Sequence, residues 1–255
     1  MLKTIYSARW YLVLGLLTFL LTLVVTVPLH FVWRFVEPQL QGLPVQISQV
    51  RGSVWQGSAR VRVPQLLELG EIDGRWQLQP AALLLGELKL HLKLDTPDLR
   101  LRLPVTLSAS HLKIDAGNGY FDLAPLKPIF AREQGSAEGA VELQQLVTTV
   151  QLEPLAIEDI SGRLTYSGGQ VSLLVENKPV KAELPPLLGQ LSKDSDKAVL
   201  VANTQEQQTL FEGFLKDDGW AGLAIRRSFI DVLGQTWPMK AEADDVIFEV
   251  SRKVL

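Results

Sequence analysis

The residues that could carry out acid–base or metal chemistry are few in this chain. It has three histidines, His30, His91 and His111, and no cysteine. The missing cysteines exclude disulfides, thiolate metal sites and thiol nucleophiles. His91 lies on the polar face of a predicted strand between two lysines. His111 precedes Asp115 by four residues, a spacing that a helix would align, but the residues around it predict a strand or a turn. We therefore expect no catalytic or metal-binding histidine, and a hydrolase built on His111 and Asp115 is the weakest hypothesis.

Adjacent carboxylates occur three times, at Glu158-Asp159, Asp217-Asp218 and Asp244-Asp245. Paired carboxylates can serve as general acid and base. Neighbouring residues of a strand, however, point to opposite faces, and Asp217-Asp218-Gly219 is typical of a turn, so we expect solvated charges. The sequence also lacks a phosphate-binding loop, a nucleophile elbow and an HExxH motif. These observations predict a protein that is not an enzyme and that holds no cofactor and no metal.

The elements that would position any site are predicted to be strands with one apolar face. The run Glu87–Asp95 reads ELKLHLKLD, and Leu99–Leu103 reads LRLRL. Strict alternation of apolar and polar residues indicates half-buried strands with one side in water. A one-sided row of leucines predicts an apolar groove face formed by Leu88, Leu90, Leu92, Leu94, Leu101 and Leu103.

Turn and helix signals complete the expected fold class. Turns are predicted at Asp95–Asp98, Asp115–Gly119 and Ser167–Gly169, and their close spacing favours antiparallel hairpins. Short helices are predicted at Pro80–Leu85, Pro125–Arg132, Pro185–Leu191 and Arg227–Leu233. We expect a mostly β protein, in which a curved, largely antiparallel sheet with short helices follows one transmembrane helix.

The transmembrane helix is predicted from the apolar run Trp10–Val27, which contains 18 residues and no charge. About 20 apolar residues span a bilayer, and no small-residue cleavage site follows, which disfavours a signal peptide and a buried core helix. Basic residues precede the span, so residues 1–9 are expected in the cytoplasm, 10–33 in the membrane and 34–255 across it. Anchor residues in contact with membrane lipid would include Trp10, Leu14, Leu17, Phe19, Leu21 and Val25.

The charge balance restricts the partners of the predicted exported part. The chain has 25 basic and 28 acidic residues and a net charge of −3. A nucleic-acid-binding protein normally carries an excess of Lys and Arg on one face. We therefore expect no nucleic-acid partner.

One block of the sequence resembles a known family. The segment Gly52-Ser-Val-Trp-Gln-Gly-Ser-Ala59 and the later Ile72-Asp-Gly-Arg-Trp-Gln-Leu-Gln-Pro80 are similar to motifs of the N component of the bacterial type II secretion system. The residues that carry the resemblance are Gly52, Val54, Trp55, Gly57, Gly74 and Trp76. It implies a single-pass inner-membrane protein with a periplasmic domain, an accessory subunit that acts through contacts with other secretion subunits.

A second reading follows from a more distant resemblance. The N component is similar to the AsmA-like group, whose members build curved sheets with an apolar inner face and are associated with lipid transport. This implies an alternative function, the binding or transfer of a lipid or another hydrophobic ligand in the groove. The alternative depends on whether the apolar face holds a ligand or closes on a second layer, since a large apolar face is not stable in water.

Overall fold

The computed structural model of the chain describes residues 13–16, 18, 19, 22, 29, 33, 34, 45–64, 69–132, 135–175, 178–237 and 240–254. Of the predicted anchor residues, Trp10, Leu17, Leu21 and Val25 lie outside these residues. Leu14 and Phe19 are helical, with 59% and 63% of their surface exposed. Within the described part, no helix has the length and apolar character needed to cross a bilayer. The transmembrane anchor stays a prediction.

More than half of the described residues form one 13-stranded sheet in which every neighbouring pair of strands is antiparallel. This confirms the predicted mostly β, largely antiparallel fold. The sheet begins with β1 (Gln46–Gly52), β2 (Gln56–Arg62), β3 (Ile72–Gln79), β4 (Leu88–Asp95), β5 (Leu99–Leu107), β6 (His111–Asp122), β8 (Ala140–Leu152) and β9 (Leu155–Tyr166). It continues with β12 (Leu187–Asp194), β13 (Lys197–Thr204), β14 (Thr209–Lys216), β15 (Trp220–Arg226) and β16 (Val246–Lys253).

A second, three-stranded sheet interrupts this sequence of hairpins. It contains β7 (Ser136–Ala137), β10 (Gly169–Val175) and β11 (Lys178–Leu184), so that β9 pairs with β12 across an inserted hairpin. The short helices are η2 (Pro80–Leu85), η3 (Ala124–Leu126), α3 (Lys127–Arg132) and α4 (Arg227–Val232). Three of the four predicted helices are therefore present. Gly234 follows α4 with φ 68°, a left-handed conformation that glycine adopts without strain.

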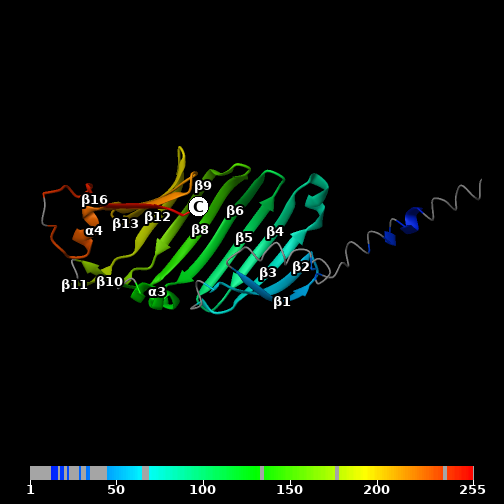
Figure 1. The fold of residues 1–255 in the computed structure, drawn as a ribbon, viewed down its shortest axis with the longest axis horizontal. Coiled ribbons are helices and arrows are strands. Elements are labelled where there is room, and N and C mark those ends of the chain that lie inside the picture. Colours follow the sequence, from blue (N-terminus) through cyan, green and yellow to red (C-terminus); the bar gives the residue numbers. More distant parts are fainter. Residues whose placement is uncertain are drawn as a thin grey trace, which may run out of the picture.

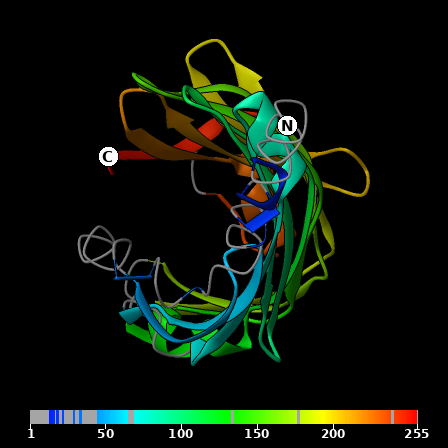
Figure 2. The ribbon, with the colours of Figure 1, turned by 90° about the vertical axis from the view of Figure 1, so that its right-hand side faces the viewer.

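The long sheet is curved along its whole length. Figure 1 shows the strands side by side along the long axis, with α4, β10 and β11 at the left end. Figure 2, an end-on view, shows that the sheet curls into an open arc. The best-buried cluster lies where the small sheet meets α4 and consists of Val171, Leu184 and Leu233, each less than 10% exposed. The arc is thus capped at one end by a small core.

Two of the predicted local structures are wrong. Pro185–Leu191 was expected to be helical, but β12 begins at Leu187, because this segment pairs with both β9 and β13. The predicted turn Asp115–Gly119 lies inside β6, where two register shifts absorb the extra residues. Ala116 takes a positive φ of 55° there, so bulges bend the strand without ending it.

Candidate functional site

The register of the sheet builds one continuous apolar row across it. Residues directly opposite each other in neighbouring strands lie on the same face. From β2 to β16, one chain of such pairs contains only apolar residues and glycines. Its members, here called the apolar row, are Ala59, Gly74, Leu94, Leu101, Gly119, Leu143, Leu164, Gly189, Ala202, Phe211, Ile225 and Phe248.

Glycines let the leucines of the row lie flat on the sheet. A Cβ added to Gly119 would be 2.5 Å from a methyl of Leu101, and one added to Gly189 would be 3.1 Å from the Cβ of Leu164. The leucine side chains therefore occupy the space that a side chain on the neighbouring strand would need. Close packing of this kind within a single layer buries part of each leucine without a second sheet.

The predicted groove leucines lie on the same face as the apolar row. Leu94 and Leu101 belong to the row, and the neighbouring pairs are Leu92 with Leu103, Leu90 with Val105 and Leu88 with Leu107. All six predicted groove leucines are half-buried: Leu88, Leu90, Leu92, Leu94, Leu101 and Leu103.

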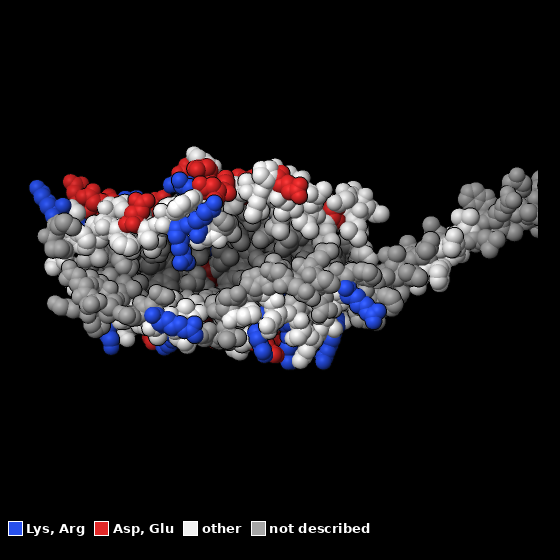
Figure 3. Space-filling model, viewed as in Figure 1, with Lys and Arg blue, Asp and Glu red and all other residues white. Residues whose placement is uncertain are grey.

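This face lines the hollow of the arc. Figure 3 looks into the hollow and shows the Lys, Arg, Asp and Glu side chains mostly along its upper and lower borders. The alternate residues of the same strands, such as Lys93 and Arg102, carry the charges and face the other way. At the capped end, Phe229 of α4 meets Phe211 of the row edge to face, with ring centroids 6.4 Å apart. The hollow therefore offers a long, half-exposed apolar surface.

The motif residues lie at the first hairpins of the sheet. Gly52 ends β1, Val54 and Trp55 form the turn, and Gly57 in β2 is paired with Trp76 in β3. The indole N–H of Trp76 donates a hydrogen bond of 3.2 Å to the carbonyl of Val54. Gly74 is a member of the apolar row. These motif residues thus shape the first hairpin and begin the apolar face.

His111 lies in a hydrogen-bond chain that does not include Asp115. Its Nδ1 is 2.7 Å from the hydroxyl of Ser110, and its Nε2 is 3.1 Å from Glu158. Serine, histidine and a carboxylate are the residue types of a catalytic triad. Here the histidine and glutamate side chains are 33% and 43% exposed at a hairpin turn, a position that does not exclude water. Within the described residues, no group of His, Asp and Glu could hold a metal ion.

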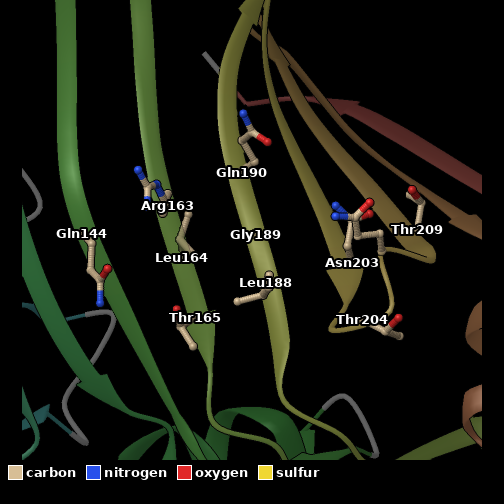
Figure 4. A pocket seen from close by; sticks show the side chains of 11 residues that line it. Gln144, Arg163, Leu164, Thr165, Leu188, Gly189, Gln190, Asn203, Thr204 and Thr209 are labelled. Carbon is tan, nitrogen blue, oxygen red and sulfur yellow. The ribbon is translucent and has the colours of Figure 1, made fainter.

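The opposite face of the sheet carries a polar groove, shown in Figure 4. Its volume is about 670 Å³, and its lining comes mainly from β8, β9, β12 and β13. Gln144, Arg163 and Gln190 stand in register across three strands and present amides and a guanidinium. The side-chain oxygen of Asn203 is buried there, and the part of the chain that the structure describes offers it no hydrogen-bond partner. The two faces of the sheet are therefore chemically distinct.

Asp217 connects three segments at the border of the sheet. Its carboxylate accepts hydrogen bonds of 2.9 Å from Lys193 in β12 and 3.2 Å from the backbone N–H of Ile157 in β9. The hydrogen bond from Lys193 lowers the pKa of Asp217, and the N–H of Ile157 adds to this effect. This carboxylate was expected to be simply solvated, yet it ties the β14–β15 turn to two neighbouring strands.

The lowered pKa of Asp217 predicts a pH-dependent contribution to stability. A carboxylate with a lowered pKa in the folded state stabilises the fold above its unfolded pKa of about 3.9, and this contribution is lost as the pH falls. We expect Asp217→Asn to lower the free energy of unfolding more at pH 7 than near pH 3. Urea unfolding at both pH values measures this difference. Lys193→Met should give the same pH dependence, and equal losses at both pH values would contradict the assignment.

The comparisons with known proteins give one family. Residues 44–226 match the family described as type II secretion system (T2SS), protein N. Neither the curated proteins nor the solved structures contain a match to this chain. The matched region runs from the start of β1 to the end of β15 and includes the motif residues and most of the apolar row. This chain belongs to the type II secretion system protein N family.

Proposed function

We propose that this protein is an inner-membrane-anchored accessory subunit of the type II secretion machinery, with its sheet in the periplasm. The observation that carries the proposal is the family match over residues 44–226. The apolar run Trp10–Val27 and the basic residues before it support the anchor and its orientation. The protein acts by binding other secretion subunits, and it carries out no reaction of its own.

The hollow is the surface that we assign to a partner subunit. Its leucines are half-buried, so part of their apolar surface remains available for a second protein. Burial of apolar surface is the main source of affinity at the centre of protein interfaces. The charged borders seen in Figure 3 would then form the polar rim of the contact.

Two paired leucines test this function. We expect a Leu94→Gln/Leu101→Gln double variant to support at least about tenfold less secretion, because two apolar contacts at the centre of an interface are lost. The measurement is the amount of secreted enzyme in the medium of a deletion strain that carries each variant. Arg102→Gln is the matched control, since it changes the same strand on the opposite face.

The outcomes of this experiment test the secretion function and the assigned binding surface separately. Secretion that is unchanged after deletion of the gene, in a bacterium that uses this component, contradicts the proposed function. Secretion that requires the gene but tolerates the double variant places the partner on another surface. Immunoblots of the membrane fraction establish that the variants accumulate to equal levels.

The alternative function, binding of a lipid or another hydrophobic ligand, rests on the same apolar row. In this case the half-exposed leucines would contact acyl chains rather than a protein. Native mass spectrometry of the purified protein distinguishes the two. A bound lipid that is lost in the Leu94→Gln/Leu101→Gln variant would favour the alternative, and a ligand-free protein would favour a protein partner.

A further inference from the structure

The last described strand, β16, has no partner on one side of its backbone within the described residues. Among the described strands it pairs with β15 only and ends the sheet. The N–H of Val254 donates a hydrogen bond to the carbonyl of Gly219. In an antiparallel pair every second residue bonds to the partner strand, so this bond identifies which residues of β16 direct their N–H and C=O groups toward β15. The N–H and C=O groups of Glu249, Ser251 and Lys253 therefore point away from β15. A free row of donors and acceptors is a template for another strand.

The side chains of this edge are also exposed and partly apolar. Val246, Phe248, Val250 and Val254 are between 47% and 54% exposed. Phe248 is the last member of the apolar row, so these residues extend the apolar face to the rim of the arc. β16 begins 20 residues after the end of the family match at residue 226. This edge therefore lies outside the region that matches the family.

We propose that β16 pairs antiparallel with β16 of a second copy of this chain. Antiparallel pairing of two identical strands requires a twofold axis normal to the sheet, and therefore residues at equal distances from the axis face each other. With the axis at Ser251, Glu249 of each copy faces Lys253 of the other. The same register places Phe248 opposite Val254 and Val250 opposite Arg252. The dimer therefore contains two Glu249–Lys253 pairs and two Phe248–Val254 pairs.

Neighbouring registers lack this complementarity. An axis at Val250 places Phe248 opposite Arg252 and leaves Glu249 opposite Ser251. An axis at Glu249 places the two Glu249 carboxylates opposite each other, and like charges opposite each other destabilise a sheet. The charges of β16 therefore select the register centred on Ser251. The resulting dimer would join two arcs into one sheet with both hollows on the same side.

The absence of cysteine from the chain makes the register directly measurable. In the full-length protein purified in detergent, Ser251→Cys places two thiols next to each other at the axis, and we expect oxidation to give a disulfide-linked dimer. Glu249→Cys alone separates the thiols by four residues, about 14 Å, beyond the reach of a disulfide. Ser48→Cys on β1, at the other edge of the sheet, is the matched control. A dimer from Ser48→Cys but not from Ser251→Cys would overturn the proposal.

Charge exchange provides the second test. We expect Glu249→Lys and Lys253→Glu each to raise the dimer dissociation constant about tenfold, since each creates two like-charge pairs. The double variant restores opposite charges and should regain the dimer in sedimentation analysis. Loss of the dimer in both single variants without recovery in the double variant contradicts this register. A wild-type protein that stays monomeric contradicts the dimer itself and leaves the proposed secretion function untouched.

Discussion

Replacing Leu210 with alanine is expected to lower the free energy of unfolding by about 2–5 kcal/mol, the range found for buried leucines. Leu210 is 0% exposed, in a sheet whose other leucines are mostly half-buried. The pairs of Ala202 with Phe211 and Asn203 with Thr209 make it the extra residue of a β-bulge. The carbonyl of the adjacent Thr209 accepts a hydrogen bond from the hydroxyl of Ser228, and the Ser228 residue is also 0% exposed. Leu210 therefore lies where α4 is fixed to the sheet.

The control for Leu210 is the same change at an exposed position. Leu188 in β12 is 48% exposed, so Leu188→Ala removes the same atoms with little change in burial, and we expect a loss below about 1 kcal/mol. Chemical unfolding followed by far-ultraviolet circular dichroism measures both variants in the full-length protein. Equal losses for the two leucines would show that the capped end of the arc contributes no special stability.

Local alternation predicts the strands most accurately where neighbours in the chain are also neighbours in the sheet. The alternation in Glu87–Asp95 and Leu99–Leu103 correctly separated the two faces of β4 and β5. It failed at Asp115–Gly119, because turn residues can also form bulges inside a strand. It failed again at Pro185–Leu191, because β12 pairs with β9 across an inserted hairpin, a long-range contact that local patterns do not contain.

The candidate site was predictable in part for a related reason. The leucines of the hollow were visible as alternating residues, but the glycines that make room for them were not. Gly119 was assigned to a turn, although in the structure it lies opposite Leu101 and Leu143. Gly189 likewise lies between Leu164 and Ala202. The structural role of each glycine depends on which residues lie opposite it in two neighbouring strands. Only the folded sheet determines that register.

A glycine of the family motif gives the second large effect. Gly57 lies under the indole of Trp76, and a Cβ at this position would be 2.8 Å from Cε2 of the ring and 2.7 Å from the carbonyl oxygen of Arg51. Both distances are shorter than van der Waals contacts, so Gly57→Ala must displace the indole or the edge strand β1. We expect a loss of about 2–3 kcal/mol in the free energy of unfolding, the cost of overpacking.

Gly74, in the neighbouring strand, is the matched control for this effect. A Cβ at Gly74 would be 3.4 Å from both the carbonyl of Ala59 and a methyl of Leu94, which is an ordinary contact. Gly74→Ala should therefore change the free energy of unfolding by less than about 1 kcal/mol. The alanine also reduces the conformational freedom of the unfolded chain, which offsets part of any loss in the folded state. If the indole causes the cost at Gly57, then Gly57→Ala will be at least about 1 kcal/mol less harmful in a Trp76→Leu background. Additive losses in this double-mutant cycle would instead assign the cost to the carbonyl of Arg51 and to the position of β1.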